Sequence, residues 1–153
     1  MKYSLIVVVF LVINFGALAI GSWLMDNGPQ TDWYLSLNKA PWTPPGWVFG
    51  AAWTTIMICF SIYMAQLYSN DKSFMVIALF IVQVVLNVSW NFVFFNQHNA
   101  GFALIIIISL TLLLIYFLIG FYDQMKLISL LLVPYVLWLL IATSLNYYVY
   151  ANN

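Results

Sequence analysis

The chain has 153 residues, of which 65% are hydrophobic and only 5% are charged. A soluble domain carries about 25% charged residues, so this composition excludes a water-soluble monomer as well as intrinsic disorder. Four lysines and four aspartates give a net charge of zero, which excludes the basic surface that nucleic-acid binding requires. With one cysteine, Cys59, the chain can form neither an internal disulfide nor a cysteine-based metal cluster.

Five apolar stretches are long enough to cross a membrane as helices of about 20 residues. They cover residues 4–25, 47–68, 74–95, 101–122 and 127–149, and every charged residue lies outside them. A membrane β-barrel would alternate apolar and polar residues in segments of about ten, and the apolar run 103–119 does not alternate. We therefore predict an all-α integral membrane protein, residues 1–153, in which five helices form a single bundle. The short links after the second, third and fourth spans predict that these neighbours lie side by side.

The first span allows two interpretations. Lys2, the apolar run and the small residues Ala17-Leu18-Ala19 are similar to a secretory signal peptide with its cleavage site. The apolar run continues past that point to Met25, which is far enough to cross a membrane. We therefore expect a retained transmembrane helix, and a cleaved signal peptide stays open as the alternative.

The lysines predict which way the bundle lies in the membrane. With five spans, Lys2, Lys72 and Lys126 share one side, and Lys39 lies alone on the other. Cytoplasmic loops carry the excess of Lys and Arg. The N-terminus is therefore predicted to be cytoplasmic, with the C-terminus and the long first loop on the outer side.

The first loop, residues 26–46, is too long to be a simple link, because loops beyond about 12–15 residues are uncommon without a function. Trp33 and Tyr34 lie in its middle, and its second half is stiffened by three prolines, which are Pro41, Pro44 and Pro45. Tryptophan and tyrosine often form a belt at the membrane surface, but belt residues flank spans and these two do not. We therefore favour a lid over the bundle, with one helical turn at residues 33–37.

Polar side chains of the third span recur on one helical face. The polar residues are Gln83, Asn87 and Asn91, and the aromatic residues Trp90 and Phe94 share their face. Carboxamides are costly toward lipid and are expected to face the interior of the bundle. Two interpretations stay open and are compatible, namely hydrogen bonds between helices and the lining of a ligand cavity.

The second and fifth spans add aromatic residues. In the second, the stripe Phe49, Trp53, Met57 and Phe60 is typical of ordinary packing, but Trp53 follows the loop closely enough to be a site candidate. In the fifth, Pro134 predicts a kink because it leaves the carbonyl of the residue four positions earlier without its helical partner. Trp138 and Ala142 share a face, where the small side chain leaves a hollow that suits a flat ligand.

No Asp, Glu, Lys, Arg or His lies within a span, which argues against proton-driven transport. The sequence also contains no phosphate-binding loop, paired carboxylates or Ser/His/Asp arrangement, and His98 stands alone in a short link, where we expect it to be solvated. Any site is therefore built from aromatic rings and carboxamides.

These motifs, in order, resemble the translocator protein family, also called tryptophan-rich sensory proteins or TspO/MBR. The segments that carry the resemblance are Trp33-Tyr34, Leu37-x-Lys39, Pro41-Trp42-x-Pro44-Pro45-x-Trp47-Val48-Phe49, Trp53-Thr54, Asn87-x-x-Trp90, Phe94-Phe95 and Pro134-Tyr135-x-x-Trp138-x-x-x-Ala142-Thr143-x-Leu145-Asn146. No single segment is diagnostic, but the ordered set on five spans is specific.

The resemblance implies a five-helix bundle with a pocket under the first loop, and a homodimer as the usual assembly. It implies binding of tetrapyrroles such as protoporphyrin IX and haem, and of other flat hydrophobic ligands, with no required cofactor and no metal site. The matching pocket residues are Trp33, Tyr34, Pro44, Trp53, Asn87, Trp90, Trp138, Ala142 and Leu145. Because the chain is minimal, we expect it in a bacterial plasma membrane.

Three functions stay open. The first is a receptor or sensor that binds porphyrin in the tryptophan-lined pocket. The second is an enzyme that degrades porphyrin with light and oxygen, in which Trp53 and Trp138 would be the catalytic residues. The third is a carrier of porphyrins, lipids or sterols, although no inverted repeat is present, and Tyr147 is not followed by the Lys or Arg of the sterol motif.

Overall fold

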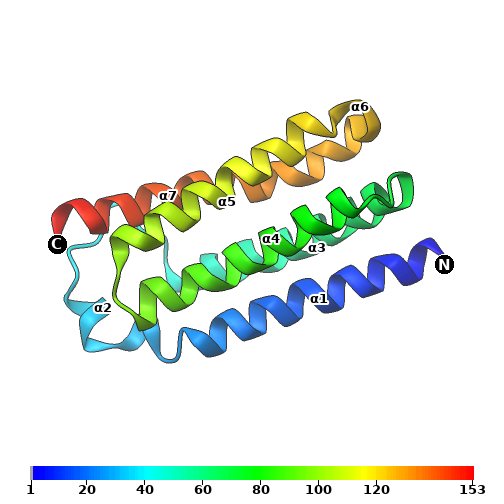
Figure 1. Cartoon of the computed structure of the whole chain (residues 1–153). Coiled ribbons are helices and arrows are strands. Elements are labelled where there is room, and N and C mark those ends of the chain that lie inside the picture. The colour runs from blue at the N-terminus through cyan, green and yellow to red at the C-terminus, as the bar shows by residue number, and fades with distance from the viewer. Residues whose placement is uncertain (1) are drawn as a thin grey trace.

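In the computed structural model, which describes residues 2–153, the chain folds into a bundle of long helices (Figure 1). The long helices are α1 (Tyr3–Leu24), α3 (Gly46–Asn70), α4 (Phe74–Asn91), α5 (Ala100–Gly120) and α7 (Val133–Asn152). The shorter segments are the 3-10 turn η1 (Gly28–Gln30), α2 (Asp32–Ser36), the π-helical turn η2 (Phe92–Asn96), α6 (Tyr122–Met125) and the 3-10 segment η3 (Lys126–Leu132).

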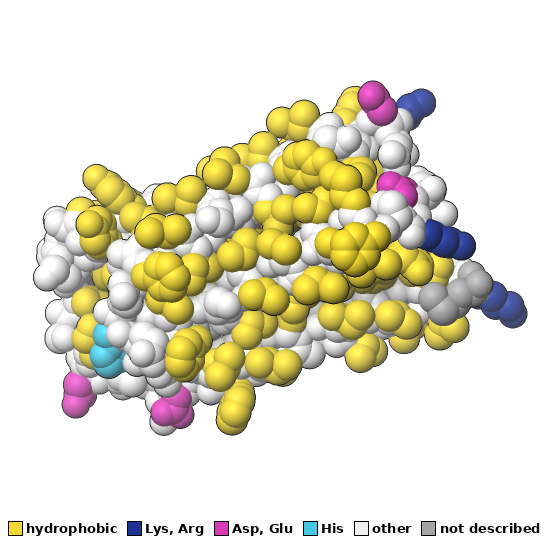
Figure 2. Space-filling model, in the orientation of Figure 1, with side chains coloured by type: hydrophobic (Ala, Val, Ile, Leu, Met, Phe, Trp, Pro, Cys, Tyr) yellow, Lys and Arg dark blue, Asp and Glu magenta, His cyan; other side chains and the backbone are white. Residues whose placement is uncertain are grey.

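Five helical units of the described chain are long and apolar enough to cross a membrane. They are Tyr3–Gln30, Gly46–Asn70, Phe74–Asn96, Ala100–Gly120 and Tyr122–Asn152. Hydrophobic side chains cover the flank of the molecule, while charged side chains lie at its two ends (Figure 2). The predicted all-α membrane bundle of five spans is confirmed. Its fifth unit begins earlier than predicted because α6 and η3 continue helical geometry through the last link.

The helices form a ring in which α1 packs against both α3 and α4, α4 against α5, α5 against α7, and α7 against α3. The expected adjacency is confirmed for α4 with α5 and for α5 with α7. It holds only in part for α3 and α4, which are joined by residues 71–73 but pack less extensively. Their contact includes the rings of Phe60 and Phe80, with centroids 6.1 Å apart. A short link brings the ends of two helices together, but the packing of α1 on both of them decides how the rest of each helix runs.

Pro134 changes the type of helix rather than bending an α-helix. It stands at the start of α7, directly after the 3-10 segment η3. Because proline has no N–H, the Leu130 carbonyl cannot be bonded four residues on, and it accepts the Val133 N–H three residues on instead. The predicted disturbance of the fifth span therefore takes the form of a 3-10 entry into α7.

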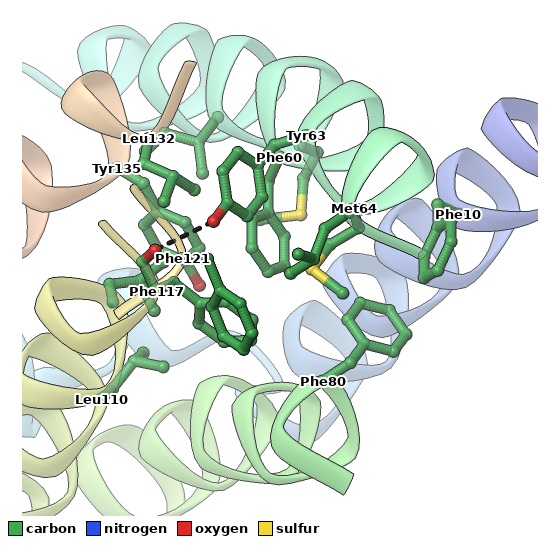
Figure 3. Packing of buried hydrophobic residues seen from close by; sticks show 14 of the residues in the cluster. Phe10, Phe60, Tyr63, Met64, Phe80, Leu110, Phe117, Phe121, Leu132 and Tyr135 are labelled. Carbon is green, nitrogen blue, oxygen red and sulfur yellow. Dashed lines mark hydrogen bonds between the residues drawn. The ribbon is translucent and has the colours of Figure 1, made fainter. Parts of the chain in front are cut away.

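The half of the bundle remote from the first loop is filled by side chains (Figure 3). Phe60 and Tyr63 of α3 pack edge-on against Phe117 of α5, with ring centroids 6.1 and 6.2 Å apart. The Tyr63 hydroxyl donates to the Phe117 carbonyl at 2.9 Å, and Tyr135 of α7 packs on Phe60 at 5.5 Å. Space for a ligand is consequently found in the other half, beneath the loop.

Candidate ligand-binding site

A cavity of 410 Å³ lies beneath the first loop, between α1, α3 and α4. This volume falls within the range of small-molecule sites, roughly 300–1,000 Å³. Its aromatic lining comes from three elements and the loop, as Tyr34, Phe49, Trp53, Trp90 and Phe95. Its polar lining consists of Ser22, Lys39, Thr43, Asn87 and Asn91. The arrangement is that of a largely apolar site with a few placed polar groups.

Two smaller voids lie next to this cavity, on the side of α5 and α7. One of 50 Å³ is bordered by Ala142 and Leu145, and one of 30 Å³ is bordered by Trp53, Asn87 and Trp138. Trp138 and Ala142 are buried, and they face these voids rather than the main cavity. The predicted pocket residues of α7 are therefore close to the cavity but separated from it.

On the polar face of α4, some residues bond to α7 and another lines the cavity. Gln83 donates to the Tyr135 hydroxyl at 2.8 Å, and the Trp90 indole N–H donates to Asn146 Oδ1 at 2.9 Å, so both join α4 to α7. Asn87 is 6% exposed and borders the main cavity. Its backbone carbonyl accepts from the Asn91 side chain, but its own side chain makes no hydrogen bond within residues 2–153. Its side-chain carboxamide is therefore free for a ligand.

A turn of helix in the loop presents Tyr34 to the cavity. The N-cap Thr31 accepts the Tyr34 N–H, as expected at the start of a helix. At the other end, the Lys39 ammonium donates to the carbonyls of Tyr34 at 2.8 Å and Leu35 at 3.3 Å, and it lies 4.7 Å from the centre of the Tyr34 ring. Burial raises the pKa of the Tyr34 hydroxyl, so this group stays neutral at physiological pH.

Trp33, the other predicted lid residue, lies away from the three spaces described above. Its indole stacks on the His98 ring with centroids 4.2 Å apart and packs edge-on against Phe94 at 5.6 Å. His98 is exposed, as expected, yet it carries this contact on the link between α4 and α5. Trp33 therefore attaches the loop to the bundle, whereas Tyr34 faces the space beneath it.

The loop is also attached to the C-terminal end of α7. The Trp42 indole N–H donates to Ser144 Oγ at 3.1 Å. The Asn153 side chain pairs with the backbone of Asn38, accepting its N–H at 2.8 Å and donating to its carbonyl at 3.2 Å. Contacts on two sides thus hold the loop closed over the cavity.

The helical bundle with five candidate membrane spans is consistent with what comparison with known proteins shows. A sequence model of the TspO/MBR family matches residues 6–151. The chain belongs to the TspO/MBR family. It is 36% identical to the tryptophan-rich protein TspO of Archaeoglobus fulgidus, over 87% of each chain. It is 31% identical to the tryptophan-rich sensory protein of Cereibacter sphaeroides over 76% of this chain and 73% of that one, and 30% identical to the human translocator protein over 83% and 78%.

In this TspO/MBR chain eight of the nine predicted site residues divide into two groups, and Trp33 borders none of the three spaces. The main cavity is lined by Tyr34, Pro44, Trp53, Asn87 and Trp90, and the smaller voids receive Trp138, Ala142 and Leu145 in addition. Sequence reasoning missed the wall contributed by α1, which includes Leu18 and Ser22, and the ring of Phe95. The small residues Ala17 and Gly21 were a signal for close approach to α1. The π-helical turn that holds Phe95 had no sequence signal.

Proposed function

We propose that this TspO/MBR protein is a membrane receptor or sensor that binds planar, largely apolar ligands beneath its first loop, with porphyrins such as protoporphyrin IX and haem as the leading class. The observation that carries the proposal is the free Asn87 carboxamide in a cavity walled by Trp53 and Trp90. Indole rings offer stacking area to a flat guest, and a carboxamide supplies one directional hydrogen bond. The sensory name of the Cereibacter relative agrees with this role.

Lys39 supports a ligand with an acidic edge. An ammonium has three N–H donors, and those of Lys39 reach two carbonyls, with no aspartate paired to it in the described chain. The side chain also borders the main cavity and the 50 Å³ void. A porphyrin is a flat apolar disc with carboxylates at one edge, so its disc suits the tryptophans and its edge suits Lys39.

The test is a titration of the purified protein with protoporphyrin IX, followed by quenching of tryptophan fluorescence. We expect the double variant Trp53→Phe/Trp138→Phe to bind about tenfold more weakly, a loss of roughly 1.4 kcal/mol. The matched control is Trp23→Phe/Trp47→Phe, which removes two indoles that are 78% and 75% exposed. Equal affinity of the two double variants would contradict the assigned pocket.

A second function, light- and oxygen-dependent degradation of the porphyrin, is favoured by the position of Trp53 and Trp138 on one void beside Asn87. In this reaction dioxygen would be the oxidant, the porphyrin ring would be oxidised and opened, and the two indoles would relay electrons. Illumination of the complex in air should then produce a new absorption spectrum. The same product at the same rate from Trp53→Phe/Trp138→Phe would show that the protein only holds the porphyrin.

The location in a bacterial plasma membrane, with a cytoplasmic N-terminus, is part of the same proposal. Lysine side chains gather at the end of the bundle where the N-terminus lies (Figures 1 and 2), as the positive-inside rule requires of the cytoplasmic side. A reporter fused after Asn153 should be active only outside the cytoplasm. We also propose that the protein is a homodimer. The molar mass of the protein part of the detergent complex tests this, and we expect twice the mass of one chain.

A further inference from the structure

Phe49 stands between the three spaces of the site. Its ring borders the main cavity of 410 Å³, the void of 50 Å³ and the void of 30 Å³. It packs edge-on against the Trp138 indole, with centroids 5.1 Å apart and planes at 86°. Phe49, together with Trp53 and Asn87, thus stands between the cavity beneath the loop and the buried indole of α7.

Trp90 also borders all three spaces, but the two rings are held differently. The Trp90 indole is fixed by its hydrogen bond to Asn146 and is stacked on Phe94 with centroids 5.2 Å apart. The Phe49 ring has no polar atom, so it can turn without breaking a hydrogen bond. Of these two residues that border all three spaces, Phe49 is therefore the one whose ring can turn.

The first turn of α3 leaves room for that movement. A helical side chain leans back over the residue three or four positions before it, and the residue three positions before Phe49 is Gly46. A Cβ placed on Gly46 would meet no atom within 4 Å. Gly46 borders the main cavity, as Phe49 does, so this position carries no side chain that would block the ring on the cavity side.

We propose that Phe49 determines the size of planar ligand that this site admits. With the ring in its present position, a small aromatic ligand occupies the main cavity and does not reach α7. When the ring turns, the cavity joins the two voids, and a ligand as wide as a porphyrin gains contact with Trp138 and Ala142. This inference rests on the proposed binding of planar ligands and adds the residue that decides their size.

The experiment compares protoporphyrin IX with the two-ring acid 2-naphthoate on the full-length protein. If the open position is populated at about one part in ten, removing the ring should tighten porphyrin binding by about tenfold. We therefore expect Phe49→Ala to bind protoporphyrin IX more tightly and faster, whereas naphthoate, which loses a ring that lines its cavity, should bind no more tightly than to the unchanged protein. Phe49→Leu, which retains more of the packing, should lie between wild type and Phe49→Ala.

A second measurement tests whether the ligand reaches Trp138 behind the Phe49 ring. In the otherwise unchanged protein, Trp138→Phe should weaken binding of protoporphyrin IX but leave naphthoate binding unchanged. Weaker porphyrin binding by Phe49→Ala and Phe49→Leu, or an equal change for both ligands, would overturn the inference and leave the proposed function standing. Failure of the unchanged protein to bind either ligand would contradict the proposed function itself.

Discussion

The indole of Trp33 and the imidazole of His98 lie stacked, with their centroids 4.2 Å and their planes 14° apart. They join the middle of the first loop to the link between α4 and α5, two segments that lie at the same end of the bundle (Figure 1). Trp33, which the sequence suggested as a ligand contact, therefore supports the loop in the folded chain.

Replacing His98 should loosen the loop without unfolding the bundle. An aromatic pair contributes about 0.5–1.5 kcal/mol beyond its buried area, so His98→Ala should speed hydrogen exchange of the α2 amides by about two- to tenfold. Exchange within α3 and α5 should stay as it is. Gln97→Ala alters the neighbouring exposed residue and serves as the control. If both variants exchange alike, the stacking does not hold the loop.

The charge of Lys39 should matter only for acidic ligands. Lys39→Met is expected to weaken binding of protoporphyrin IX by about tenfold and to leave binding of its neutral dimethyl ester unchanged. Because Lys39 also bonds the carbonyls at the end of α2, a general loosening of the loop would lower both affinities together, and that result would contradict a direct contact. Lys126→Met, at the opposite end of the bundle, is the control for net charge.

Gly28 is required by the close approach of η1 to η2. A Cβ at this position would lie 2.7 Å from both Phe95 Cβ and Met25 Cγ. Gly28→Ala should therefore displace the loop from the ring that lines the cavity, with a loss of about 1–3 kcal/mol of stability and weaker ligand binding. Gly16→Ala has no atom within 4 Å of the new Cβ and should melt like the unchanged protein. Thermal unfolding in detergent measures both.

One hydrogen bond joins α1 to α3 inside the membrane-spanning region. The buried Asn14 carboxamide donates to Ser61 Oγ at 2.8 Å. Ser61→Ala would leave that donor without a partner, and bonds of this kind contribute about 0.6–1.7 kcal/mol. We expect a corresponding fall in stability toward denaturing detergent. Ser109→Ala should have little effect, because within residues 2–153 its exposed hydroxyl bonds only to Ile105 of its own helix. A fall of equal size in both variants would contradict the role of the contact.

Local pattern was sufficient for the five spans and for the helical turn in the first loop. Runs of about 20 apolar residues bounded by charges specify spans because the thickness of the hydrocarbon layer sets their length. The helical turn predicted at residues 33–37 is present as α2, shifted by one residue, since its N-cap Thr31 is a local signal. The π-helical turn η2 was not predicted, and it carries Phe94 and Phe95 into the space beneath the loop.

Local pattern could not show which polar residues on one face of α4 bond to another helix and which line the cavity. Gln83 and Asn87 are one helical turn apart and chemically alike. In the described part of the chain, however, the Gln83 side chain donates to the Tyr135 hydroxyl of α7 and the Asn87 side chain meets no hydroxyl. Asn87 meets the cavity instead. The difference depends on what the neighbouring helix presents at each height, which no spacing within α4 contains.

By itself, the order of apolar runs, charges, prolines and tryptophans determined a five-span membrane bundle with an ordered first loop, because these features follow from local chemistry and from the thickness of a bilayer. The resemblance to the TspO/MBR family came from the ordered motifs. The tertiary structure alone decided that α1 packs between α3 and α4, that Trp33 supports the loop while Tyr34 faces the cavity, and that Phe49 stands before Trp138. These relations arise where side chains from distant parts of the chain compete for the same space, and packing rather than sequence spacing resolves that competition.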